Sequence, residues 1–351
     1  MKKISLFISA ALVASLALAS CSDDDALNEN HGAAISFRSS MGTRAVETTN
    51  SNLTSINVAA FLGDAQYFNI LPFNKGNDGY FTSSTTYNWP GDNSTLTFYA
   101  FSPAAPGGTV KLTSEEKTMT AFSPASDIAN QVDFITANAT GTKDENEATG
   151  VPLKFDHRLA QITVLAKTDN TAYTYKVTGI RVGQPVSTAD FNFTTNEWTL
   201  ATDKAIYDET YTTPVVLGSE PASVMGEGGN LMLIPQQLTA WSPTTDAANA
   251  SKGAYLAIKL QINTVAGAQV YPFPSEANCE WAAIPINDNW EAGKRYVYTL
   301  DLTHGAGYVD PNDPDPGKPV LGGPIKFTVQ VTDWVNSSSD LSMDTGSEQS
   351  I

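Results

Sequence analysis

Alternation of apolar and polar residues at every second position is the feature that most constrains how this chain can fold. Around Ile162 and Val164, apolar side chains occupy one set of positions, and turn-rich stretches such as 102–108 separate segments of this kind. A period of two is that of a β-strand with one buried face. The sequence therefore predicts an all-β fold, for which β-sandwiches are the natural architecture. The clearest segments are 35–38, 56–62, 96–101, 160–166, 256–262, 296–302 and 325–331.

Helices have little place in this pattern, because no long segment has a period of 3.6 residues. Only 126–132 and 203–207 are expected to form short helices. A chain of 351 residues suits two domains of ordinary size. The polar stretch 140–150 is the expected boundary between them. The expected units are a first domain at 33–150, a second at 151–336 and a polar tail at 337–351.

The first residues have the pattern of a lipoprotein signal peptide. Two lysines precede an apolar run, 4–19, that is shorter than the ~20 residues needed to span a bilayer. Cleavage between Ser20 and Cys21 would remove residues 1–20 and leave a thiol that accepts a diacylglyceryl group, with a further chain such as palmitate on the freed amine. Two or more chains anchor a protein stably to a membrane. We expect the acidic residues 21–32 to form a tether between the lipid and the fold.

Composition and charge narrow the classes of function. Once the signal peptide is removed, Cys279 is the one thiol besides Cys21, so no internal disulfide is expected in the fold. The chain is 41% hydrophobic and 10% aromatic, which is a globular composition. Its net charge of −17, from 20 basic and 37 acidic residues, would repel phosphate backbones. No nucleic-acid partner is therefore expected.

Residues that could carry chemistry are few and scattered. The histidines His31, His157 and His304 have no neighbour at metal-ligand spacing, and no dinucleotide-binding loop or nucleophile elbow occurs. The sequence therefore predicts a protein that is not an enzyme, with no catalytic residues and no cofactor. Trp89 and Trp241 would stack on sugars if they were exposed, but aromatic residues of strands more often lie in a core.

An acidic loop is a weak candidate for a metal site. Asp310, Asp313 and Asp315 place three carboxylates within 310–317, and carboxylate oxygens are ligands that calcium prefers. The spacing lacks the calcium-loop pattern and its terminal glutamate. A solvated loop between strands is therefore the favoured interpretation, and no metal is expected.

A second processing signal follows the first alternating segment. Arg44 and Ala45 lie among small and polar residues, and an exposed arginine in a loop is a favourable site for an arginine-specific protease. Cleavage there would release the lipid together with a strand at 33–44, in which Ile35 and Phe37 share one face. A sandwich that loses an edge strand exposes an apolar groove and unpaired backbone groups. Such a groove can accept a strand from another chain.

Several stretches of the chain resemble the fimbrillin family, the subunits of type V pili of anaerobic Gram-negative bacteria. One is the lipoprotein signal that ends at Cys21, and the others follow in order to the end of the last strand. Each stretch is moderately specific, and together they cover the chain. They are 42–45, 87–90, 96–100, 153–160, 233–236, 290–298 and 331–334.

The resemblance implies two transthyretin-like β-sandwich domains and export as a lipoprotein to the outer-membrane surface. It further implies cleavage by an arginine-specific protease between Arg44 and Ala45, displacement of the strand 33–44, and assembly with other pilin subunits by donor-strand exchange. The product would be part of an extracellular fimbrium that serves cell adhesion through a host or bacterial surface receptor.

The end of the sequence bears on the position of the subunit in such a filament. A stalk subunit is expected to provide a C-terminal donor strand with alternating apolar residues. The tail after Trp334 offers Leu341, Met343 and a final Ile351 among serines and acids, which makes a poor donor. A tip or accessory subunit is therefore favoured over a stalk subunit. The alternative is a permanently anchored outer-membrane lipoprotein that binds glycan or host protein.

Overall fold

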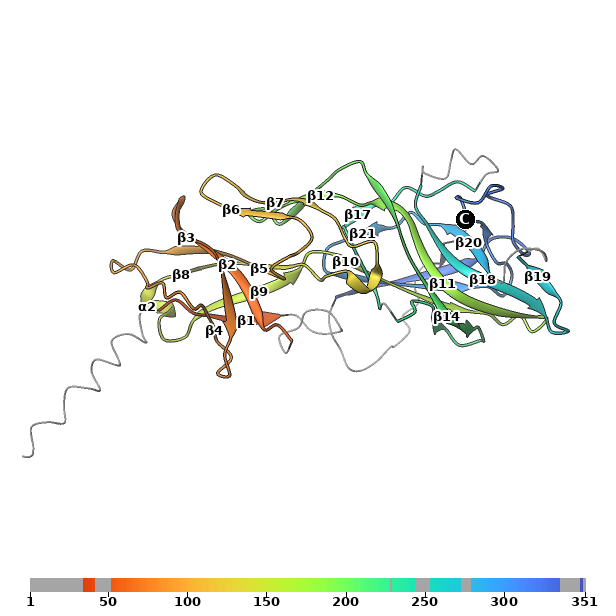
Figure 1. Cartoon of the computed structure of the whole chain (residues 1–351), viewed down its shortest axis with the longest axis horizontal. Coiled ribbons are helices and arrows are strands. Elements are labelled where there is room, and N and C mark those ends of the chain that lie inside the picture. Colours follow the sequence, from red (N-terminus) through yellow and green to blue (C-terminus); the bar gives the residue numbers. More distant parts are fainter. Residues whose placement is uncertain are drawn as a thin grey trace, which may run out of the picture.

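The computed structural model describes residues 34–41, 52–227, 229–243, 253–272 and 279–334, together with the backbone of 348–349. The molecule is elongated, with the first strands at one end and most of the later strands towards the other (Figure 1). Nearly all of its regular elements are strands, which confirms the all-β prediction. In the described part of the chain, no helix is both long enough and apolar enough to cross a membrane.

The N-terminal half contains a closed β-barrel. Its strands follow one another in the order β1, β4, β3, β2, β5, β8 and β9, and β9 pairs with β1 to close the ring. Apolar side chains such as Phe68, Phe73 and Phe98 fill one continuous core and are almost completely buried. The barrel strands are β1 (Phe37–Met41), β2 (Ser55–Leu62), β3 (Ala65–Lys75), β4 (Phe81–Thr82), β5 (Leu96–Ser102), β8 (Ile135–Gly141) and β9 (Val151–His157).

The C-terminal half contains two larger sheets whose side chains form one core cluster, as in a β-sandwich. The core includes Ile162 and Tyr298 from one sheet and Ile180 and Ile258 from the other. One sheet consists of β15 (Ala222–Ser223), β10 (Ala160–Lys167), β22 (Lys294–Asp301), β24 (Lys326–Asp333) and β25 (Glu348–Gln349), with β16 (Leu231–Leu233) paired to β10. The other consists of β14 (Lys204–Val216), β11 (Tyr173–Val186), β18 (Tyr255–Thr264), β20 (Glu280–Pro285) and β23 (Tyr308–Val309), with β19 (Gln269–Tyr271) paired to β18.

A four-stranded sheet joins the two halves. It combines β6 (Thr109–Leu112) and β7 (Lys117–Phe122) with β12 (Ala189–Asn192) and β13 (Glu197–Leu200), which lie between β11 and β14 in the sequence. Its core is aromatic: the ring centroids of Phe134 and Phe191 are 5.3 Å apart, and those of Phe191 and Trp198 are 4.9 Å apart. A short pair, β17 (Gln236–Gln237) and β21 (Asn289–Trp290), completes the described strands.

A buried polar contact lies where the barrel meets the last long strand. Nδ1 of His157, at the end of β9, is 2.9 Å from one carboxylate oxygen of Asp133. The His157 ring stacks on Trp334 at a centroid distance of 4.3 Å and an interplanar angle of 10°. The backbone N–H of Trp334 donates to the carbonyl of Gly293 at 2.7 Å. These contacts tie the end of the barrel to residues that follow β24.

The two expected helices have different outcomes. Within 126–132 the chain forms the 3-10 helix η1 (Ile128–Asn130), where the Asp127 side chain accepts a hydrogen bond from the N–H of Ala129. The helix expected at 203–207 is wrong, because these residues lead into β14. There Tyr207 is buried, so pairing with β11 and burial override the local preference.

The division of the chain at 150/151 stays a prediction. The polar stretch 140–150 contains the short helix α2 (Lys143–Asn146) and connects β8 to β9. β9 pairs with β1 and with β8, so residues 151–157 lie in the barrel sheet. The strand that opens the sheets of the C-terminal half is β10.

Close packing between β11 and β18 gives a stability prediction. A methyl group at Gly183 would overlap the phenol ring of Tyr255, which is completely buried. We expect Gly183→Ala to lower the free energy of unfolding by about 1–3 kcal/mol, because the ring has no room to move away. The matched control is Gly218→Ala, where an added methyl group meets no atom within 4 Å. Urea denaturation checks the difference, and equal midpoints for the two variants would contradict this packing.

Candidate functional site

The strand β1 closes the barrel between β4 and β9 (Figure 1). It pairs in parallel with β9 over five positions, from Phe37 opposite Val151 onwards, but with β4 at the single position of Phe37 and Phe81. Just before the strand, the N–H of Ile35 donates to the carbonyl of Tyr87 at 2.8 Å. The barrel is therefore closed by a segment that is held mainly along one edge.

The side chains of this segment alternate between the core and the solvent. Phe37 is completely buried, and its ring makes edge-to-face contacts with Phe73 at 4.9 Å and with Phe98 at 5.1 Å. Ile35 is 5% exposed and belongs to the same core, whereas Arg38 is exposed. Burial of a side chain such as Phe or Ile contributes about 1.5–3 kcal/mol. Each edge-to-face aromatic pair adds roughly 0.5–1.5 kcal/mol.

Ser36 lies in a narrow place between these two apolar residues. The backbone N–H of Val151 donates to its carbonyl at 2.9 Å. Gly150 has a φ of +67°, and a methyl group there would lie 3.2 Å from Oγ of Ser36 and 3.1 Å from Cδ1 of Tyr80. The chain reaches this conformation after α2, where the N–H of Gly150 donates to the carbonyl of Asn146. Gly150 thus leaves room for a small side chain at position 36.

The sequence-predicted site residues fall into two groups. Ile35 and Phe37 lie side by side in the core, on the face that their alternation predicts. Ser20, Cys21, Arg44 and Ala45 lie outside the described residues. The residues that receive Phe37 were not singled out from the sequence. Phe98 lies in a recognised alternating segment, but which strand faces it depends on long-range pairing.

The acidic loop is held by protein donors. Oδ2 of Asp310 accepts a hydrogen bond from Arg181 at 3.2 Å, and its Oδ1 accepts one from the N–H of Asn312 at 2.8 Å. Oδ1 of Asp313 accepts from the N–H of Asp315, and Asp315 forms an ion pair with Lys318. Across the described ranges, no three His, Cys, Asp or Glu side chains are placed together to hold a metal ion.

The groups around Asp310 compensate for the burial of its carboxylate. The Arg181 guanidinium also binds Asp208 and lies 4.1 Å from the ring centroid of Trp281. The phenol of Tyr255 accepts a hydrogen bond from Asn312 at 2.7 Å. Burial, and next the charge of Asp310, raise the pKa of Tyr255, so the phenol stays neutral. The cluster fixes the loop onto the sheet of β18 and β20.

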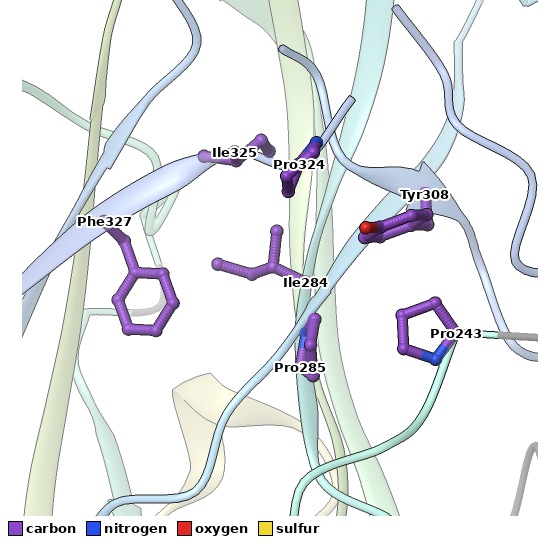
Figure 2. A pocket seen from close by; sticks show the side chains of 7 residues that line it. All are labelled: Pro243, Ile284, Pro285, Tyr308, Pro324, Ile325 and Phe327. Carbon is purple, nitrogen blue, oxygen red and sulfur yellow. The ribbon is translucent and has the colours of Figure 1, made fainter. Parts of the chain in front are cut away.

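A small apolar pocket lies near the start of β24 (Figure 2). Its volume is about 60 Å³, which is little more than a few methyl groups would fill. Tyr308 contributes the one polar side chain to the lining, so the pocket lacks the groups that catalysis or metal binding needs. The lining residues are Pro243, Ile284, Pro285, Tyr308, Pro324, Ile325 and Phe327.

The sugar-stacking interpretation finds no support at the two tryptophans considered for it. Trp89 is 5% exposed and packs edge-to-face on Phe98, with 5.9 Å between ring centroids. Trp241 is 3% exposed and contacts Tyr255.

Cys279 is half-buried and has a free thiol. The strand β1 and the residues that receive it are therefore the principal candidate site.

Truncation of the buried aromatic residue tests how firmly β1 is held. We expect Phe37→Ala to lower the free energy of unfolding by about 3–5 kcal/mol, because it removes a completely buried ring and leaves a cavity. Arg38→Ala, at the exposed neighbouring position, should change it by less than about 0.5 kcal/mol. Chemical denaturation of both variants measures the difference. A cost below about 1 kcal/mol for Phe37→Ala would contradict the docking of β1.

Comparisons with known proteins identify a family for this chain. The sequence profile of the fimbrillin-like family matches residues 43–334, whereas no curated protein sequence matches the chain. A solved fimbrial protein from Bacteroides vulgatus is similar with a TM-score of 0.53 at 15% identity, covering 86% of this chain and 99% of that chain. This likeness shows a shared fold.

Two candidate cell adhesion proteins, from Bacteroides uniformis and Bacteroides ovatus, are also similar. Their TM-scores are 0.47 and 0.49, at 17% and 16% identity. The matches cover 86% and 87% of this chain, and 98% and 99% of theirs. Because the family profile spans most of the sequence, the chain belongs to the fimbrillin-like family and is a structural, non-enzymatic fimbrial subunit.

Proposed function

We propose that this subunit is made as a lipoprotein acylated at Cys21, is cleaved between Arg44 and Ala45, and assembles with other pilin subunits by strand exchange. Cleavage frees the segment that precedes Ala45, including β1, from its covalent link to the fold. A strand of a neighbouring subunit then takes the place of β1 in the barrel. The lipid delivers the precursor to the outer membrane, and cleavage commits it to the extracellular fimbrium.

The position of β1 in the barrel is the observation that carries this proposal. It is the first of the described strands, and removing it leaves β4, β3, β2, β5, β8 and β9 as a continuous sheet. The loss would expose the backbone edge of β9 together with the aromatic rings of Phe73 and Phe98. An exposed edge beside an apolar core is the kind of surface that binds an added strand.

The extent of the family match supports a processing boundary between β1 and the rest of the fold. The matched region begins at residue 43, after β1 has ended and one residue before Arg44. The covalent link from β1 to the rest of the fold runs through residues 42–51, so one cut at Arg44 is sufficient to free the strand.

We further propose a tip or accessory position in the fimbria. Leu341, Met343 and Ile351 are the apolar residues of a tail that is otherwise rich in serine and acidic residues. A donor strand needs alternating apolar side chains to fill an acceptor groove. A subunit with a good acceptor and a poor donor would end a filament rather than extend it. Adhesion to a surface receptor fits that position.

Treatment of the lipid-free precursor (22–351) with an arginine-specific protease tests the cleavage. We expect a new N-terminus at Ala45, because Arg38 lies within β1 and is protected by pairing with β9. Arg44→Ala should abolish the cut, whereas the matched variant Arg38→Ala should be cut at the same place as the unchanged protein. N-terminal sequencing identifies the products.

Assembly is tested on the same material. With partner subunits, the cut protein should form oligomers that resist mild denaturant, and the Arg44→Ala variant should not. A cut at a different residue, or a cut product that stays monomeric with its partners, would contradict the mechanism. Protein from producing cells that still begins at acylated Cys21 would favour the anchored lipoprotein instead.

A further inference from the structure

We infer that the acceptor site selects its donor strand by an ordered set of three side chains: an aliphatic residue, a small residue and an aromatic residue in succession. The inference rests on the proposed strand exchange. It adds which donor sequences would fit the acceptor site. The three sites are those that Ile35, Ser36 and Phe37 occupy in the closed barrel. The donor is a strand of another pilin subunit that runs in the direction of β1.

The aromatic site is set by ring geometry. Phe37 is completely buried, and Phe73 and Phe98 meet its ring at interplanar angles of 87° and 83°. The rings of Phe73 and Phe98 therefore bound a space that fits a flat aromatic side chain. An aliphatic residue would fill part of this space but would lose both edge-to-face contacts. A small residue would leave a cavity in the core, which is the costlier defect.

The small-residue site is set by Gly150 and Tyr80. The hydroxyl of Ser36 is so close to Gly150 that even a methyl group on this glycine would lie 3.2 Å from it. The same methyl group would lie 3.1 Å from the Tyr80 ring, so the ring and the glycine together bound the space. Ser36 is half-buried, and a branched side chain at position 36 that followed the path of its hydroxyl would meet both of them. Overpacking of this kind is destabilising.

The neighbouring positions differ in how strongly they constrain the donor. Ile35 is 5% exposed within the barrel core, so its site requires an apolar side chain. The Arg38 side chain is exposed, on the face of β1 that points away from the barrel core. Position 38 therefore leaves the donor free to vary. The combination of a small residue between two large apolar ones distinguishes this site from one that accepts any alternating strand.

Exchange of synthetic peptides measures this selectivity. The lipid-free precursor is cut by the arginine-specific protease, the protease is inhibited, and fluorescent peptides with the sequence of residues 33–44 are added under mildly denaturing conditions. We expect the parent peptide to bind, and the peptide with Phe37→Ala to bind at least about 100-fold more weakly. The peptide with Ser36→Leu should bind at least about fivefold more weakly.

The control peptide carries Arg38→Ala and should bind within about twofold of the parent. Binding of the Phe37→Ala peptide within twofold of the parent would overturn the aromatic requirement, and equal binding of the Ser36→Leu peptide would overturn the small-residue requirement. Failure of the parent peptide itself to exchange into a protein cut at Arg44 would instead overturn strand exchange, and the selectivity with it. The two kinds of failure are therefore distinguishable.

Discussion

The burial of one aromatic side chain, Phe37, holds the N-terminal barrel closed. Its ring contacts Phe73 on β3 and Phe98 on β5, so a residue of β1 completes a core that is built by strands to which β1 is not hydrogen-bonded. The backbone of β1 is paired along β9 but hardly along β4. Side-chain burial, more than backbone pairing, therefore fastens the strand on its β4 side.

The strands β2 and β5 are buried on both faces, so part of their packing does not depend on β1. One face of each strand, with Val58 and Phe98 for example, belongs to the barrel core that contains Phe37. The other face, with Phe61 and Phe101, belongs to the aromatic core of the joining sheet. Removal of β1 would uncover only the first of these cores. The joining sheet would keep the two halves together, so a subunit that awaits a donor strand could remain folded.

The sequence was sufficient for those features that depend on local pattern. Alternation put Ile35 and Phe37 on one buried face and located seven of the strands, namely β1, β2, β5, β10, β18, β22 and β24. It could not give the pairing of β1 with β9 or the meeting of β7 with β12, because such pairings join segments that are far apart in the chain. The segment 203–207 was expected to be helical, and its place in β14 results from burial of Tyr207 against the core.

For the same reason, only part of the candidate site could be predicted from the sequence. The strand that would leave could be recognised from its alternation and from the arginine that follows it, but the rings that receive Phe37 come from two other strands. The close approach of Ser36 to Gly150 depends on a left-handed backbone conformation after α2, which the sequence around Gly150 does not specify. The proposed selectivity for a donor strand would therefore be a property of the folded barrel.

The most direct test is mass spectrometry of this subunit taken from fimbriae that cells have assembled. If β1 is a removable closure, the N-terminal peptide of the assembled subunit begins at Ala45, and no peptide from residues 33–44 remains bound. A subunit that begins at Cys21 with its lipid, or that retains residues 33–44 in the assembled fimbria, would contradict the replacement of β1 by a strand from a neighbour.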